Sequence, residues 1–142
     1  MKKVILILIF ILQTFTFADV SDWTIVNDKG EFWLKSKTSK SLKAVITKRT
    51  GKSKVVETKS VGKNYELIIY YSGSAGTFHM VDIFYAIIFD KKKKQFIGDF
   101  PWKYKSQQGK KVVNPEWKIT EESIKIRDEQ TGLEKTIKLT SN

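Results

Sequence analysis

One stretch of the sequence carries residue types that could supply a nucleophile, a base and an acid. Ser72, Ser74, His79 and Asp82 fall within eleven residues, and His79 is the only histidine of the chain. A serine hydrolase needs a serine hydroxyl beside an imidazole that a carboxylate orients. If a strand runs from residue 79 onward, His79 and Asp82 point to opposite faces of the sheet, so the carboxylate cannot orient the imidazole. No helical pattern follows the stretch either, as the strand–turn–helix elbow of such hydrolases requires.

The sequence contains even fewer of the residues that metal sites, phosphate-binding loops and glycosidase sites require. With one histidine and no cysteine, the chain lacks a clustered set of metal ligands. Gly73 and Gly76 lack the helix and the lysine–threonine ending of a phosphate-binding loop. Asp82 and Asp99 could face each other as a pair of glycosidase carboxylates, but nothing in the sequence requires it. We therefore expect no catalytic residue, no metal site and no cofactor, and hence a non-enzymatic protein.

The same stretch is better interpreted as a turn that could contact a partner. The segment "SGSAG" at 72–76 resembles the Ser-Gly-rich loop of periplasmic lysozyme inhibitors, small exported β-barrels that insert such a loop into the enzyme's cleft. The resemblance covers five residues, and the chain lacks the cysteines of some of those inhibitors. It implies inhibition of a hydrolase through residues 72–79. The candidate binding residues are Tyr70, Ser72, Gly73, Ser74, Gly76 and His79.

The elements that must position these residues are short runs in which apolar side chains recur at every second position. In "SIKIR", Ile124 and Ile126 face one way while Lys125 and Arg127 face the other, which is typical of a half-buried antiparallel strand. No comparable helical pattern occurs beyond the first residues, and at most a short helix is expected within 105–116. We delimit ten runs and expect one or two to merge or fail: 22–26, 31–36, 41–48, 54–60, 65–71, 79–89, 95–104, 116–120, 123–128 and 133–139.

This pattern predicts an all-β fold. We expect a single antiparallel domain of about eight strands, built as a meander of hairpins that forms a small barrel or a sandwich. The run 79–89 is apolar on both faces, so it is expected at the centre of its sheet between 65–71 and 95–104. In the last of these runs, Phe96, Phe100, Trp102 and Tyr104 share one predicted inward face.

Residues 1–18 have the pattern of a secretory signal peptide. Two lysines precede the apolar run Val4–Leu12, and Thr16 and Ala18 are the small or short residues that signal peptidase inspects. A membrane-spanning helix needs about 20 apolar residues, whereas polar residues at 13, 14 and 16 interrupt this run. We predict cleavage after Ala18, export to the periplasm or beyond the cell, and no transmembrane span after cleavage. The mature chain, 19–142, is expected to be one β domain.

The charge of the mature chain points to the kind of partner. Loss of Lys2 and Lys3 leaves 24 basic and 15 acidic side chains, a net charge of +9. Such a balance favours an anionic neighbour, for example a lipid head group, a cell-wall polymer or an acidic protein. It would also repel a strongly basic lysozyme. The candidate basic patch comprises Lys48, Arg49, Lys52, Lys91, Lys92, Lys93 and Lys94.

Charged strand ends have a second explanation, because they also discourage aggregation between sheet edges.

Interleaved basic and aromatic residues are typical of single-strand nucleic-acid binders. Here most aromatic residues belong to the signal peptide or to predicted inward faces, which leaves Trp23, Trp33 and Tyr70 as candidates for exposure. We expect no nucleic-acid partner. The favoured function is that of an exported envelope binding or accessory protein, and the alternative is a periplasmic hydrolase inhibitor.

Overall fold

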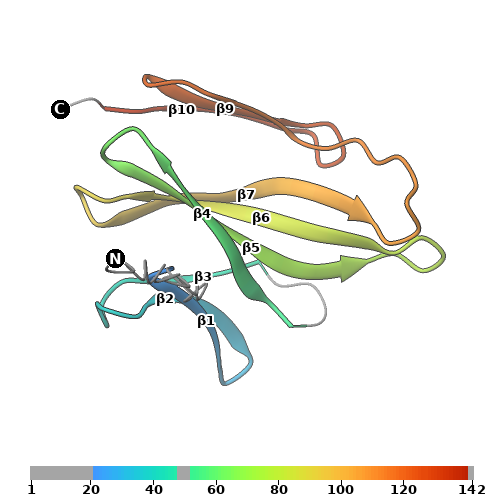
Figure 1. Cartoon of the computed structure of the whole chain (residues 1–142), viewed down its shortest axis with the longest axis horizontal. Coiled ribbons are helices and arrows are strands. Elements are labelled where there is room, and N and C mark those ends of the chain that lie inside the picture. Colours follow the sequence, from blue (N-terminus) through green and yellow to red (C-terminus); the bar gives the residue numbers. More distant parts are fainter. Residues whose placement is uncertain (1–20, 48–51, 141–142) are drawn as a thin grey trace, which may run out of the picture.

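The computed structural model describes residues 21–47 and 52–140, which form ten strands in three antiparallel sheets and contain no α-helix (Figure 1). Each sheet is a meander in which neighbours in sequence pair with each other. This confirms the all-β class, with all ten sequence runs kept as separate strands. None of the sheets closes into a barrel. The strands are β1 Trp23–Asp28, β2 Glu31–Ser36, β3 Lys43–Val45, β4 Lys54–Val61, β5 Tyr65–Ala75, β6 Val81–Asp90, β7 Gln95–Ser106, β8 Glu116–Ile119, β9 Ser123–Asp128 and β10 Leu133–Lys138.

The four-stranded sheet β4–β5–β6–β7 is the middle layer of the molecule. The sheet β1–β2–β3 covers one face and the sheet β8–β9–β10 covers the other, as Figure 1 shows. Side chains of β5 and β6 alternate between the two cores, so that Ile87 packs toward β1–β3 and Ile88 toward β8–β10. The expectation that β6 lies between β5 and β7 and is buried on both faces is confirmed.

A β-bulge in β7 changes which of its aromatic side chains face which core. Ile88 pairs with Gly98 and Phe89 pairs with Phe96, so Ile97 is an extra residue without a partner in β6. An extra residue reverses the alternation of the strand beyond it. Phe96 therefore packs toward β1–β3, whereas Phe100 packs toward β8–β10. A second bulge at Trp102 returns Tyr104 to the core that contains Phe96. The prediction that Phe96, Phe100, Trp102 and Tyr104 share one face is therefore wrong.

Aromatic side chains with polar tips join the three layers. The indole of Trp23 is buried and its Nε1 donates a hydrogen bond to Glu66 Oε2 (3.2 Å), so its expected exposure is wrong. On the opposite face, Trp117 Nε1 donates to the carbonyl oxygen of Pro101 (2.8 Å). Such side chains bury a large apolar body and still satisfy their polar atom, which stabilises the contact between layers.

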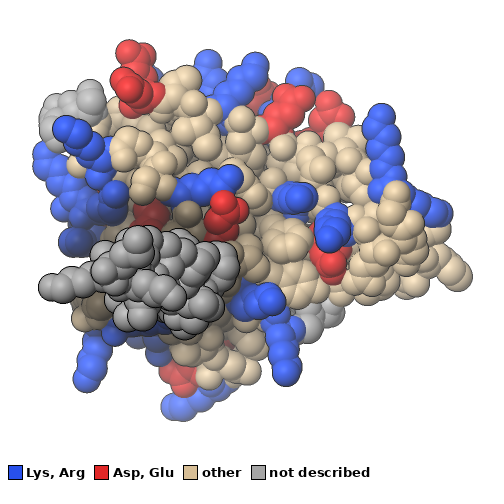
Figure 2. Space-filling model, in the orientation of Figure 1, with Lys and Arg blue, Asp and Glu red and all other residues tan. Residues whose placement is uncertain are grey.

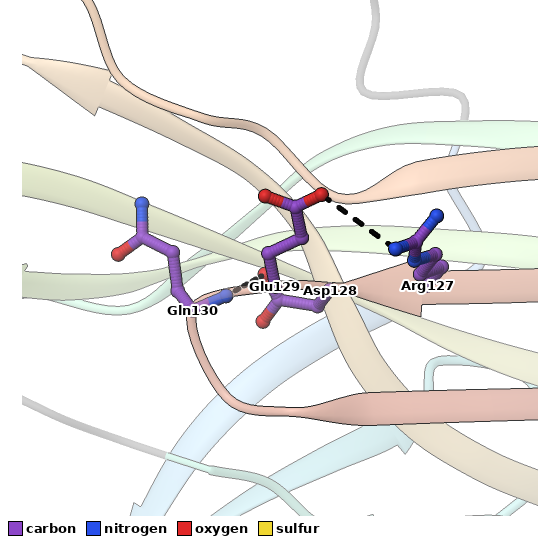
Figure 3. A network of polar contacts seen from close by, with 4 residues as sticks. All are labelled: Arg127, Asp128, Glu129 and Gln130. Carbon is purple, nitrogen blue, oxygen red and sulfur yellow. Dashed lines mark hydrogen bonds and ion pairs between the residues drawn. The ribbon is translucent and has the colours of Figure 1, made fainter.

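A buried carboxylate connects the outer sheet β8–β10 to β7. Asp128 is 1 % exposed, and its Oδ2 accepts hydrogen bonds from the hydroxyls of Tyr104 (2.7 Å) and Thr131 (2.6 Å). Its Oδ1 accepts from the backbone N–H of Gln130 (3.2 Å), as Figure 3 shows beside the exposed ion pair of Arg127 and Glu129. An exposed ion pair contributes little to stability. The turn is therefore held chiefly by Asp128.

The β5–β6 hairpin is longer than the sequence indicated. β5 continues through Ala75 and β6 begins at Val81, so the turn spans only 76–80. Tyr71 pairs with Phe84 and Gly73 with Ile83, which leaves Ser72 as the extra residue of a second bulge. The predicted end of the strand at residue 71 is wrong because Gly73, with φ of 127°, lets the chain pass through the bulge and resume pairing.

The glycine at the start of this turn is required by two constraints. Gly76 has φ of 115°, and a Cβ atom there would lie 2.2 Å from the carbonyl oxygen of His79. We expect Gly76→Ala to lower the free energy of unfolding by about 2–4 kcal/mol, because the clash adds to the backbone strain. Urea denaturation monitored by tryptophan fluorescence measures this change.

Gly62→Ala is the matched control, because Gly62 has φ of 59° and open space where the Cβ would lie. Its expected loss is about 1 kcal/mol, from backbone conformation alone. Equal losses in the two variants would contradict the steric role assigned to Gly76.

Candidate functional site

The first residues of the candidate loop face the interior of the protein. Tyr70 is 0 % exposed, so the expectation of an exposed contact residue is wrong. Its hydroxyl donates to Asp99 Oδ2 (2.6 Å) and accepts a hydrogen bond from the backbone N–H of Thr47 (3.0 Å). Ser72 is also buried, and its Oγ donates to the carbonyl oxygen of Thr47 (2.6 Å). These two side chains hold the chain segment that follows β3 and are closed to a partner.

The remaining residues of the candidate loop lie in or beside the turn. Ser74 is half-buried and pairs with Asp82, whereas Gly76 and His79 are exposed. The imidazole Nε2 of His79 lies 2.8 Å from Lys110 Nζ. His79 precedes β6 instead of belonging to it, so the predicted start of that strand is wrong. A serine, a histidine and a carboxylate are present here, but each has a different neighbour, and the geometry is not that of a triad.

Asp99 is the most perturbed carboxylate of the described residues. Its Oδ1 is buried without a hydrogen-bond donor in the described part of the chain. Burial raises the pKa of Asp99 to about 6, although hydrogen bonds from Tyr70 and the backbone of Thr47 act in the opposite direction. Burial, and then the charge of Asp99, raise the pKa of the Tyr70 hydroxyl. The pair is a closed polar contact within the middle sheet, and both side chains also accept from the backbone N–H of Thr47 after β3.

The pair of carboxylates considered for glycoside hydrolysis does not form. Asp99 pairs with Ile87, whose side chain packs toward β1–β3. Asp82 is an odd number of residues away from Ile87 on the same strand, so it points to the opposite face of the middle sheet. The two carboxylates are separated by the sheet itself and cannot flank one bond.

The lysines of the β6–β7 turn form the densest basic cluster described. Asp90, 5 % exposed, accepts hydrogen bonds from the backbone N–H groups of Lys92 (3.0 Å) and Lys93 (2.9 Å) and so fixes the turn. The N–H of Lys91 donates to the carbonyl oxygen of Asn64 (2.7 Å), which brings the β4–β5 turn alongside. That turn adds Lys63, which sequence reasoning missed because the two turns lie far apart in the chain. We call Lys63 and Lys91–Lys94 the lysine end.

Surface hollows adjoin the lysine end. Lys91 and Lys94 line a hollow of about 350 Å³ together with hydroxyl-bearing residues of the β2–β3 connection and the carboxylates of Asp22 and Glu66. Lys92 and Lys93 line a second one of about 130 Å³, and Lys63 lines a third of about 390 Å³. Figure 2 shows Lys and Arg side chains gathered at the end of the molecule where the β6–β7 turn lies. Because carboxylates share these linings, it is the exposed ammonium groups at the rims that can bind anionic groups on a flexible chain.

The candidate basic patch does not form one surface. Lys48 and Arg49 lie outside the described residues. Lys52 precedes β4, whose first residue Lys54 pairs with Tyr71. The other end of β4 pairs with Tyr65, which in turn pairs with Asp90 at the β6–β7 turn. Lys52 is therefore at the end of the middle sheet that carries the 76–80 turn, opposite the lysine end. The basic loop 91–94 and the glycine-containing turn are likewise at opposite ends.

No family model matches this chain, and the comparisons with curated proteins and with solved structures found no match either. Among residues 21–47 and 52–140, no group of three or more His, Cys, Asp or Glu side chains is arranged to hold a metal ion. The same part of the chain has no helix long and apolar enough to cross a membrane.

The raised pKa of Asp99 predicts a specific pH dependence of stability. Because the folded-state pKa of about 6 exceeds the unfolded value, the folded state binds the proton more tightly. The resulting stability is fully present below about pH 4 and is lost as the pH rises through about 6. Relative to Asp99→Asn, the natural protein should lose about 2–3 kcal/mol of unfolding free energy between pH 4 and pH 7.

Chemical denaturation of both proteins across this pH range measures the difference. Asp28→Asn is the control, since Asp28 is exposed and its substitution should leave the pH dependence unchanged. A constant difference between the natural protein and Asp99→Asn would show that this carboxylate does not titrate in the window.

Proposed function

We propose that this protein is an exported, non-enzymatic binding protein that presents its lysine end to an anionic component of the cell envelope. The observation that carries the proposal is the convergence of Lys63 with Lys91–Lys94 through the hydrogen bond from the Lys91 N–H to the Asn64 carbonyl. Export rests on the signal-peptide pattern of residues 1–18. Phosphate or carboxylate groups of a polymer or a lipid surface are the ligand chemistry that suits such a cluster.

The local packing supports a pre-organised cluster. Two backbone N–H groups bound to the Asp90 carboxylate fix the path of the turn, so the lysine backbone positions are defined before a ligand arrives. Lys63, Lys92, Lys93 and Lys94 are exposed. Attraction between such charges and an anionic surface contributes about 1 kcal/mol per lysine at physiological salt. The attraction is long-ranged at low salt and is screened within about 10 Å at 0.1 M.

Inhibition of a hydrolase through residues 72–79 is the alternative, and it draws less support. Ser72 and Tyr70 are buried and bonded to neighbouring elements, so they offer no contact surface. Of that loop only residues 76–79 are exposed, and Ser74 is half-buried.

Replacement of Lys91, Lys92, Lys93 and Lys94 by glutamine tests the proposal. Inorganic polyphosphate is the probe, and isothermal titration calorimetry gives the dissociation constant at low and physiological salt. We expect the natural protein to bind more weakly as salt rises and the four-lysine variant to bind at least about tenfold more weakly at low salt.

The matched control removes four positive charges elsewhere. Lys103, Lys118, Lys125 and Lys135 are exposed on strands away from the β6–β7 turn, and their replacement by glutamine makes the same change in net charge. This control should weaken binding by no more than about threefold. Equal weakening in both variants would show that binding follows net charge alone and would refute a site at the lysine end.

A further inference from the structure

A large apolar side chain projects from the end of the molecule opposite the lysine end. Phe78 is 90 % exposed, well above the next most exposed large apolar residues, Val45 at 54 % and Val113 at 52 %. It lies at the tip of the β5–β6 turn, which extends to the far end of the middle sheet in Figure 1. Burying a phenylalanine side chain is favourable by about 1.5–3 kcal/mol, so a partner that covers Phe78 would gain binding free energy of this size.

The turn that carries Phe78 is held from both sides. On one side the backbone of Gly76 packs so closely on the His79 carbonyl oxygen that no Cβ atom would fit between them. On the other, the backbone N–H of Gln107 donates to the carbonyl oxygen of Met80 (2.9 Å). The side chain of Lys110 reaches the His79 ring, with 2.8 Å between Nζ and Nε2. Phe78 is therefore presented outward by a supported turn.

Cationic side chains lie beside the base of this turn, on the β7 side. Lys105, Lys110 and Lys111 are exposed on β7 and the segment that follows it. The nearby carboxylate of Asp82 accepts hydrogen bonds from the Tyr71 hydroxyl (3.1 Å) and the Gln107 side chain (2.9 Å). An aromatic tip beside exposed lysines matches the division of a lipid interface into an apolar interior and anionic head groups.

The shape of the tip distinguishes a lipid surface from a protein partner. A stable protein interface buries about 800 Å² on each side and needs matching shapes. A convex turn of five residues offers far less area, whereas a fluid bilayer adapts its shape to the side chain that enters it. We propose that the β5–β6 tip inserts Phe78 into the interface of an anionic lipid membrane while Lys105, Lys110 and Lys111 contact the head groups.

This tip is independent of the lysine end. The ten residues of β6 separate the two ends by roughly 33 Å, at about 3.3 Å per residue, which is several screening lengths at physiological salt. A protein inserted by Phe78 directs its lysine end away from the bilayer. It can then bind a soluble or wall-attached anionic polymer while it rests on the membrane.

Sedimentation with large unilamellar vesicles tests the proposal. The vesicles contain phosphatidylglycerol and phosphatidylcholine at 30:70, or phosphatidylcholine alone, and partition coefficients are measured at about 0.15 M and 0.5 M salt. Phe78→Ala should lower partitioning into the anionic vesicles about tenfold, and Phe78→Trp should retain it. Ile119→Ala, which removes an apolar side chain that is 40 % exposed elsewhere, should have no effect.

The same comparison is made in the protein with Lys91–Lys94 replaced by glutamine. The effect of Phe78→Ala should persist there, because the lysine end does not insert. Since the chain contains no cysteine, Phe78→Cys gives a single site for an environment-sensitive fluorophore. Its emission should shift to the blue on anionic vesicles, and the emission from Ile119→Cys should not.

Partitioning that is unaffected by Phe78→Ala in both backgrounds overturns the proposal. If partitioning then depends only on Lys91–Lys94, the lipid contact belongs to the lysine end. If Phe78 instead governs capture of an acidic envelope protein, the tip recognises a protein and the lipid assignment is wrong. Normal polyphosphate binding by Phe78→Ala shows that the lysine end acts separately, so the two proposals succeed or fail independently.

Discussion

The burial of β5 and β6 on both faces is the constraint on which the rest of the structure depends. Ile87 and Ile88 are adjacent in sequence, yet each is enclosed by a different core. A strand of this kind requires a covering layer on each side, and the two three-stranded sheets supply them. The inner strands β5 and β6 can therefore reach a partner only at their ends, where turns connect them to their neighbours. This places the lysine end at one extremity of the middle sheet and Phe78 at the other, and it explains why both candidate contact sites are turns.

Polar contacts between the layers fix how the covering sheets sit. Asp128 of β9 accepts a hydrogen bond from the Tyr104 hydroxyl of β7, and Tyr70 and Asp99 of the middle sheet both accept from the backbone N–H of Thr47 after β3. Each of the two hydrogen-bonded carboxylates thus helps to join an outer layer to the middle sheet. A buried carboxylate is costly unless it is hydrogen-bonded, and Asp99 is the less well satisfied of the two because its Oδ1 has no donor in the described chain. Of the residues that suggested chemistry in the sequence, Ser72 and Asp99 are committed to this role through Thr47.

Much of the fold follows from local pattern. Alternation in the sequence predicted the all-β class, the ten runs that become strands and the central position of β6. It could not show the bulges at Ser72 and Ile97, because an extra residue changes the face of every side chain beyond it without altering the local composition. Tyr70 is expected at the surface only if its strand ends at residue 71, whereas β5 continues to Ala75. The lysine turn itself was visible, whereas its approach to Lys63 depends on a contact between two hairpins. The exposure of Phe78 depends on the length to which β5 and β6 continue.

Nuclear magnetic resonance can locate the proposed contact between the lysine end and an anionic partner residue by residue. Backbone amide shifts of the ¹⁵N-labelled protein are followed during titration with polyphosphate of defined length. We expect the largest changes in residues 62–64 and 90–95, with smaller ones in the adjoining β2–β3 connection. Changes centred on the 76–80 turn, or spread evenly over exposed lysines of all three sheets, would contradict it.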